Sequence, residues 1–249
     1  MMRLGGAALT LALALLPASG VRADGLRILS LDPCADQYAL ALSRPDDRLF
    51  LSPRADDADS HLREAAAGHP RVRPTLEAAL AARPDVVIRY WGGEPRLLAA
   101  LERRGVRAAM VADAQDFDGV RENVRSVAAE LDRVPEGAAL LKDMDARLER
   151  AAAAGAGGSA LYMTPGGFTA GEQTLVGAVL GAAGFTPAAP SPWFAPVSVE
   201  RLLFEPPTRF VLAFYEQMRA DWRGAGRHPA LRRLMGRREV VSLPGSLMG

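Results

Sequence analysis

The sequence contains one pattern twice, first as Leu76-Glu77-Ala78-Ala79-Leu80 with Arg83-Pro84-Asp85 and Val86-Val87-Ile88, then as Val199-Glu200-Arg201-Leu202-Leu203 with Glu205-Pro206-Pro207 and Phe210-Val211-Leu212. Each copy consists of a short helical segment with a glutamate in its first turn, a proline stop and an apolar strand. The first copy ends in Tyr90 and the second in Phe214-Tyr215. A repeat at this distance predicts two similar lobes rather than one enzyme core. Two lobes that face each other form a cleft in which a ligand can be held.

Apolar runs bounded by turn residues alternate with helical patterns along the rest of the chain. We expect strands at residues 26–31, 49–51, 86–88, 108–111, 160–163, 210–214 and 240–243, and helices at residues 36–42, 75–82, 94–104, 172–183, 199–204 and 229–235. Strands that alternate with helices are typical of parallel βαβ units. The sequence therefore predicts an α/β protein with two Rossmann-like lobes.

The link between the halves is predicted to be a single long helix. Residues 118–131 carry apolar side chains at helical spacing, and a second apolar stripe follows Pro135, which suits the first turn of a helix. About 18 residues at ~1.5 Å each span ~27 Å, enough to cross between two lobes. We assign residues 24–133 to an N-terminal lobe, 134–154 to the interlobe helix and 155–249 to a C-terminal lobe. A packed helix inside one domain is the alternative.

The first residues are typical of an export signal. Arg3 supplies a positive charge, residues 4–16 form an apolar run, and Val21-Arg22-Ala23 offers small residues for cleavage near Ala23. Because this run is shorter than the ~20 apolar residues that span a bilayer, we expect a signal peptide over residues 1–23. An uncleaved membrane anchor is the alternative.

Charge and cysteine content exclude several classes of protein. Without Arg3 and Arg22, 28 of the 30 basic residues remain against 29 acidic ones. A nearly neutral chain gives no electrostatic argument for binding nucleic acid or an anionic membrane. The single cysteine, Cys34, allows no internal disulfide, so stability has to come from packing. We interpret Cys34 as a small buried residue, with a reactive thiol as the alternative.

Aromatic residues gather where the predicted strands end. Ligands of open α/β sheets bind beyond the carboxyl ends of the strands. Six aromatic candidates stand at these ends or in the irregular stretch before the second glutamate: Tyr90, Trp91, Phe168, Trp193, Phe194 and Tyr215. Since only 6% of the residues are aromatic, this gathering is informative. Flat apolar walls with few polar groups suit a large, conjugated and rigid ligand.

Metal and catalytic motifs are weak by comparison. His61, His69 and His228 are scattered along the chain, so we expect no metal ion bound directly by the protein. No Gly-x-Ser-x-Gly elbow occurs, and the glycines of residues 155–158 precede a strand instead of joining a strand to a helix. We therefore expect no catalytic residues.

Glu77 and Glu200 occupy matched positions in the two copies. A glutamate in a first turn is favourable by ~0.3–1 kcal/mol through the helix dipole, so one alone means little. Two in matched positions could present one carboxylate per lobe to arginines of a common partner. Capping and docking both stay open on this pattern.

Several motifs in the same order resemble a known family. They are residues 27–36 (Arg27-Ile28-Leu29-Ser30-Leu31-Asp32-Pro33-Cys34-Ala35-Asp36), Leu76-Glu77 with residues 84–88, Gly166-Gly167-Phe168-Thr169-Ala170-Gly171 and Val197-Ser198-Val199-Glu200. On these residues the chain resembles the periplasmic substrate-binding proteins of ABC importers for ferric siderophores, haem and cobalamin, in which a long helix joins two α/β lobes. The resemblance implies a monomeric, periplasmic, non-enzymatic protein. It would capture a metal chelate and deliver it to a permease with its ATPase.

The resemblance also implies roles for particular residues. In such proteins one glutamate on each lobe docks onto permease arginines, and Glu77 and Glu200 stand at the matching places. The cleft of the cobalamin binders looks similar, because their aromatics match Tyr90, Phe168 and either Trp193 or Phe194. The metal arrives chelated, so no protein ligand is needed. We expect ligand contacts from Arg54, Tyr90, Trp91, Phe168, Trp193, Phe194 and Tyr215.

The chain departs from the family pattern in two regions. Arg54, Asp56 and Asp57 stand where cobalamin binders carry aromatics, which weakens cobalamin and leaves a ferric chelate open. Arg54 would then meet carboxylates or catecholates of the ligand. Relatives also continue into a terminal helix, whereas this chain stops at Gly249, so a truncated second lobe is an expectation.

Two other classes of function stay open on the sequence. An exported α/β enzyme that processes a metal cofactor would need an acid or base in the cleft, and Asp32, Asp36 or Glu216 could supply it. An interaction module or sensor component without transport is the third hypothesis.

Overall fold

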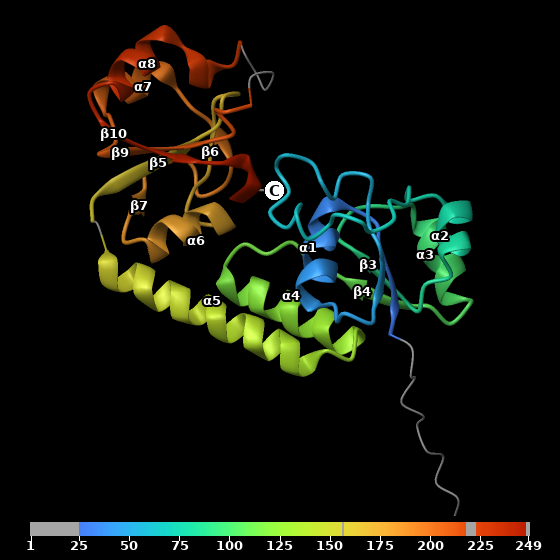
Figure 1. The fold of residues 1–249 in the computed structure, drawn as a ribbon. Helices are drawn as coiled ribbons and strands as arrows, with labels where there is room; N and C mark the ends of the chain where they lie inside the picture. Colours follow the sequence, from blue (N-terminus) through green and yellow to red (C-terminus); the bar gives the residue numbers. More distant parts are fainter. Residues whose placement is uncertain (1–24, 156, 218–222, 248–249) are drawn as a thin grey trace, which may run out of the picture.

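The structure is a computed structural model that describes residues 25–155, 157–217 and 223–247. It has two four-stranded parallel sheets, each with helices on both faces, and the long helix α5 (Val134–Ala154) runs along both lobes (Figure 1). The expected signal peptide, residues 1–23, lies outside the described residues. Within the described part of the chain, no helix combines the length and apolar character needed to cross a membrane.

Lobe one is built from the first half of the chain. Its elements are β1 (Arg27–Ser30), α1 (Pro33–Leu42), β2 (Arg48–Phe50), α2 (Leu76–Ala82), β3 (Val86–Arg89), α3 (Pro95–Glu102), β4 (Arg107–Met110) and α4 (Phe117–Glu130). The strands lie in the order β2-β1-β3-β4, and all of them are parallel. Helices α1 and α4 cover one face of this sheet, and α2 and α3 cover the other.

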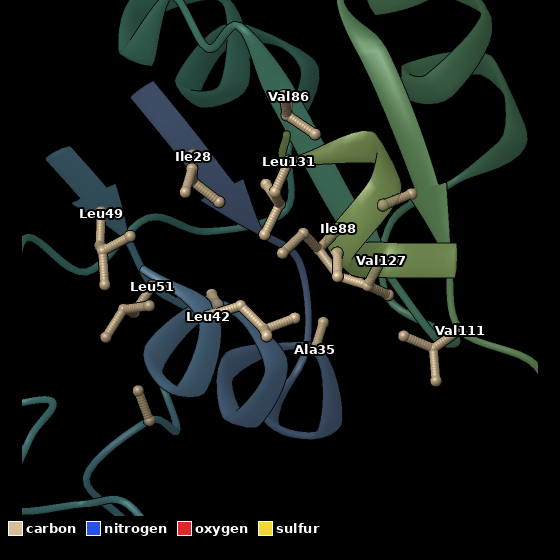
Figure 2. Packing of buried hydrophobic residues seen from close by; sticks show 14 of the residues in the cluster. Ile28, Ala35, Leu42, Leu49, Leu51, Val86, Ile88, Val111, Val127 and Leu131 are labelled. Atoms are coloured by element: carbon tan, nitrogen blue, oxygen red, sulfur yellow. The ribbon is translucent and has the colours of Figure 1, made fainter. Parts of the chain in front are cut away.

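The central strands of lobe one are mainly apolar because both of their faces are buried. Side chains alternate between the faces of a strand, so Ile28 and Val86 pack on the α1 and α4 side. Leu29 and Val87 pack on the α2 and α3 side. Figure 2 shows Ile28 and Val86 close to Leu131 of the α4 end. A parallel sheet covered on both faces requires such continuous apolar runs.

Lobe two is built from the second half. Its elements are β5 (Ser159–Met163), β6 (Phe168–Thr169), α6 (Leu175–Ala182), β7 (Thr186–Pro187), β8 (Ala195–Pro196), α7 (Val199–Phe204), β9 (Arg209–Ala213), α8 (Pro229–Met235) and β10 (Glu239–Leu243), with 3-10 turns at Ala225–Arg227 and Gly245–Leu247. The parallel sheet has the order β10-β9-β5-β7, and β6 and β8 form a separate antiparallel ribbon. Helix α6 covers one face of the sheet, and α7 and α8 cover the other.

The two sheets have the same topology. If the strands of each four-stranded sheet are counted in chain order, both sheets read second, first, third, fourth. Helix α2 precedes the third strand of lobe one, and α7 precedes the third strand of lobe two. The repeated sequence pattern therefore forms the same unit in each lobe, a short helix followed by the third strand of the sheet. The predicted α/β fold with two Rossmann-like lobes is confirmed.

Helix α5 is fixed mainly to lobe one. Arg133, just before the helix, makes a buried ion pair with Asp47 at 2.8 Å, and Asp47 also accepts hydrogen bonds from the backbone N–H groups of Leu26 and Arg44. The Arg44 side chain in turn pairs with Glu136 in the first turn of α5. In lobe two, α5 packs mainly against α6 before the glycine-rich joint, which contains Gly155, Gly157 and Gly158. The start of the helix is therefore anchored in lobe one.

The short strands of lobe two differ from the sequence prediction. Residues 172–183 were expected to form one helix, but α6 begins at Leu175, because the Thr174 side chain caps it by accepting the Gly177 N–H at 3.0 Å. Phe168 was expected in a loop and lies in β6. Strands of two residues, such as β6, β7 and β8, are too short to show an alternating pattern.

Candidate functional site

The carboxyl ends of both sheets are turned toward the opposite lobe (Figure 1). In lobe one these ends lead into α1 and into the loop of residues 90–94 after β3. In lobe two they lead into the β6–β8 ribbon and the segment after β9. Loops beyond strand ends are where α/β proteins bind ligands, so the candidate site is built from these segments.

Asp32 holds the loop after β3 in place. Its buried carboxylate accepts hydrogen bonds through Oδ2 from the N–H groups of Tyr90, Trp91 and Gly92 at 2.8, 3.1 and 3.0 Å. Through Oδ1 it accepts the Ala35 N–H at 2.9 Å and so caps α1. The sequence had offered Asp32 only as a strand-end residue or an enzymatic acid. Its function as a positioning residue depends on contacts almost sixty positions away in the chain.

The loop presents Trp91 to solvent and keeps Tyr90 against the core. The Trp91 side chain is 55% exposed. Tyr90 packs partly on the core cluster of lobe one, and its hydroxyl donates to Asp113 Oδ1 at 3.1 Å. Partial burial and the hydrogen bond to Asp113 raise the pKa of Tyr90. A side chain at Gly92 would collide with the Leu31 carbonyl, so a glycine is needed where the loop passes β1.

Lobe two gathers its aromatics through the β6–β8 ribbon. Phe168 pairs with Pro196 in the ribbon, and the Gly171 N–H donates to the Trp193 carbonyl at 3.2 Å. These bonds place Phe168, Trp193 and Phe194 in one compact segment. All three rings are exposed, with Phe194 at 62%. Exposed rings clustered at one place are more informative than scattered ones, because such patches mark binding surfaces.

Tyr215 and Arg54 are engaged by other residues of the chain. The Tyr215 hydroxyl donates to the Gly226 carbonyl at 2.9 Å, and Arg227 lies over its ring at 5.1 Å. Tyr215 thus packs partly within lobe two, and its contact with the ligand stays a prediction. The exposed Arg54 side chain pairs with Asp57 at 2.7 Å and with Asp59 at 3.6 Å. Any ligand contact by Arg54 requires exchange of these local partners.

The carboxylates considered as acids or bases of an enzyme accept hydrogen bonds from other parts of the chain. The buried Asp36 carboxylate accepts the Ser52 N–H at 2.9 Å and the Ser52 hydroxyl at 2.6 Å, and burial raises the pKa of Asp36. Glu216 accepts the Gly245 N–H. Burial, followed by the charge of Asp32, raises the pKa of the Cys34 thiol, which contradicts the alternative of a reactive thiolate. Among the described residues, no three His, Cys, Asp or Glu side chains gather as a metal site.

Glu77 and Glu200 have equivalent surroundings. Each is the second residue of its helix, after a capping Thr75 or Ser198 whose hydroxyl accepts a backbone N–H of the first turn. Both side chains are exposed, and neither makes an ion pair within the part of the chain that the structure describes. Helices α2 and α7 both lie on the sheet faces away from α5 (Figure 1). Glu200 differs only in that its carboxylate accepts a hydrogen bond from the Ser198 hydroxyl at 3.2 Å. Each lobe therefore offers one exposed carboxylate at the start of the equivalent helix.

A hollow of about 580 Å³ lies within lobe two. Its walls come from α7, from the turn before β9 and from the proline-rich segment that runs from β7 to β8; they include Ser159, Pro187, Pro190, Ser198, Arg201 and Glu205. Ser159 begins β5 and the turn precedes β9, so the hollow opens near the amino ends of these strands. It is separate from the strand-end aromatics described above.

Comparisons with known proteins agree with this architecture. The sequence pattern of the family described as periplasmic binding protein matches residues 45–213. No curated protein is a significant match. Among solved structures, the periplasmic heme-binding protein BhuT in complex with two hemes has 24% identity and a TM-score of 0.68, covering 88% of this chain and 90% of that one. RhuT from Roseiflexus sp. RS-1, a periplasmic heme-binding protein in apo form, has 23% identity and a TM-score of 0.67, covering 88% and 89%.

A third solved structure extends the likeness to lower sequence identity. The periplasmic heme-binding protein HutB of Vibrio cholerae has 15% identity and a TM-score of 0.71, covering 89% of this chain and 90% of that one. Identities at this level establish a common fold and no more. The family match, in contrast, spans most of the chain, from before β2 to the end of β9. The chain therefore belongs to the periplasmic binding protein family.

Proposed function

We propose that this protein captures a metal chelate between its two lobes and delivers it to the membrane permease of an ABC importer. The observation that carries the proposal is the presence of exposed rings on both lobes at the facing strand ends: Trp91 on lobe one, and Phe168, Trp193 and Phe194 on lobe two. Burying such rings against a flat macrocycle removes apolar surface from water and allows stacking. The chelate brings its own metal ligands.

Haem is the first ligand to test. BhuT, which has the same fold, is described in complex with two hemes, and RhuT and HutB are also described as heme-binding. The propionates of haem would find a cationic partner in Arg54 if its guanidinium exchanged Asp57 for the ligand, since guanidinium and carboxylate groups form charge-assisted pairs. Cobalamin and ferric siderophores are the other chelates that the proposal includes.

A titration of the mature protein with haemin, cyanocobalamin and a ferric hydroxamate tests the ligand. We expect quenching of tryptophan fluorescence with one of them, because Trp91 and Trp193 would stack on the chelate. Replacing either tryptophan by alanine should weaken binding roughly tenfold, the usual effect of losing an aromatic anchor. Val179→Ala is the matched control, since Val179 is exposed on α6 in lobe two. If none of the three compounds gives a response, the ligand assignment is wrong.

Glu77 and Glu200 are proposed to dock onto arginines of the permease. Both carboxylates are exposed, neither makes an ion pair with another described residue, and both stand at the start of equivalent helices. Reversing both to arginine should abolish uptake and leave the affinity for the chelate unchanged, because the change replaces attraction by repulsion at each contact. Uptake that continues unchanged in the double variant would refute docking through these two glutamates.

A further inference from the structure

Phe204 is the most exposed large apolar side chain among the described residues, with 87% of its surface open to solvent. It is the last residue of α7 and follows Glu200 by four positions. Residues four apart lie on the same side of a helix, so the ring and the carboxylate are neighbours on one surface. Leu203, also exposed, extends the apolar part. We call Glu200, Leu203 and Phe204 the lobe-two surface.

The twin helix in lobe one shows that the fold does not require this ring. In α2 the residue four positions after Glu77 is Ala81, which is also exposed. Inward positions correspond as well, because Ala79 and Leu202 are both buried against their sheets. Phe204 stands at the position where the equivalent helix carries alanine, and it contributes little to packing among the described residues of the lobe. Apolar surface of this kind marks a site of interaction.

Phe204 is also placed away from the chelate site. Helix α7 leads into the amino end of β9, which starts at Arg209, whereas the candidate ligand rings follow the carboxyl ends of the strands. The ring therefore serves a partner other than the chelate. Glu200 beside it remains without an ion pair in the described part of the chain, so the partner carries a cationic group next to an apolar hollow.

We propose that Phe204 is the apolar anchor by which lobe two docks onto the permease, entering a hydrophobic hollow beside the arginine that meets Glu200. This inference rests on the proposed function, which supplies the permease as partner. It makes the two lobes unequal, because lobe one offers a charge alone and lobe two offers a charge and a ring. A ring contact is insensitive to salt, whereas contacts between exposed charges are screened. Phe204 therefore maintains residual docking at high ionic strength.

The test uses the mature protein and the permease with its ATPase subunits from the same importer, held in lipid nanodiscs. Binding of wild type, Phe204→Ala, Glu200→Gln, Glu77→Gln and the control Val179→Ala is measured at low and high salt. We expect Phe204→Ala to weaken binding roughly tenfold or more at both salt concentrations, as the loss of an aromatic anchor does. Glu200→Gln should weaken binding at low salt and reduce its salt dependence. Haemin titrations and thermal unfolding should be unchanged in Phe204→Ala.

Other results of this experiment would each contradict a specific part of the proposal. If the glutamine variants bind less tightly and Phe204→Ala binds normally, the anchor is refuted and docking by charge stands. If every variant binds the permease as wild type does, docking through Glu77, Glu200 and Phe204 is refuted. Loss of binding to empty nanodiscs in Phe204→Ala would identify the lipid surface as the occupant. A wild-type dimer that Phe204→Ala dissociates would identify a second copy of the chain. Both results would overturn the proposal.

Discussion

At the scale of single residues, Asp32 connects the architecture to the site. One carboxylate accepts three N–H groups of the loop that carries Trp91 and a fourth at the start of α1. Backbone donors buried near a strand end have to be satisfied, and a charged acceptor does so with the strongest type of hydrogen bond. The position of Trp91 is therefore decided by a residue that is itself buried.

Replacing Asp32 by alanine should lower the free energy of unfolding by about 3 kcal/mol or more, since four N–H groups lose a charged acceptor. Urea denaturation measures this loss, and the fluorescence of Trp91 should shift as the loop is released. Asp118→Asn is the control, because Asp118 is exposed and pairs only at the surface with Arg121; its effect should stay below about 1 kcal/mol. Equal effects of both substitutions would contradict the positioning role.

Two buried tyrosines predict how stability changes at high pH. Burial raises the pKa of Tyr162 and of Tyr215 from 10.0 to about 12, although the nearby Arg227 lowers that of Tyr215 slightly. The unfolded chain ionises first, so the contribution of these phenols to stability is complete below pH 10 and is lost between pH 10 and about 12. Tyrosinate absorbance during alkaline titration measures this. If Tyr162→Phe and Tyr215→Phe both leave the late part of the curve unchanged, the prediction is wrong.

At the scale of elements, the attachment of α5 determines which parts move together. The ion pair between Arg133 and Asp47 is buried, whereas the pair between Arg44 and Glu136 is partly exposed to solvent. Both join the start of the helix to the loop between α1 and β2. Only the buried pair contributes strongly to stability, because removing one partner leaves an unpaired charge in the protein interior.

Asp47→Ala should therefore destabilise the protein by roughly 3–5 kcal/mol, since Arg133 and two backbone N–H groups lose their acceptor. Glu136→Gln should cost less than about 1 kcal/mol. Chemical denaturation gives both values, and hydrogen exchange shows whether the first turns of α5 loosen in Asp47→Ala alone. A small effect for Asp47→Ala would mean that packing against α4 suffices to hold the helix.

The sequence predicted those elements whose pattern is long enough or local enough to be visible. Central strands such as β3 are apolar on both faces, and α7 has a capping serine followed by a glutamate. The two-residue strands of the ribbon have no such signal. An aromatic residue at a strand end looks the same whether it faces a ligand, as proposed for Trp91, or packs inward as Tyr215 does. Asp32 and Phe204 could be understood only from contacts and exposure in the folded chain.

At the scale of the whole molecule, a rod fixed to one lobe limits how the lobes can approach each other. Helix α5 belongs to lobe one, and lobe two is joined to it through α6 and the glycine-rich joint, where Gly157 and Gly158 have left-handed backbone conformations. Bending is therefore confined to a few residues at one end of the helix. The geometry favours a small rotation about this joint over a wide opening.

We expect haemin binding to change the radius of gyration by less than about 1 Å, as is usual for preorganised partners. Small-angle X-ray scattering of the free and loaded protein measures the change. Glycine-to-alanine substitutions at Gly157 and Gly158, which oppose the left-handed conformations, should slow ligand binding more than they alter the size of either state. A contraction of several ångströms would contradict the small rotation and indicate a wide closure of the lobes.

Two halves of one chain with identical strand orders are what duplication and fusion of a single ancestral gene produce. In such an ancestor, two copies of one half would have bound the ligand as a symmetric dimer, and each copy would have carried the same glutamate. Once joined, the copies could diverge independently. Phe204 in α7 and Ala81 in α2 occupy equivalent positions and are a difference of this kind. This divergence would have made an originally symmetric binding surface asymmetric.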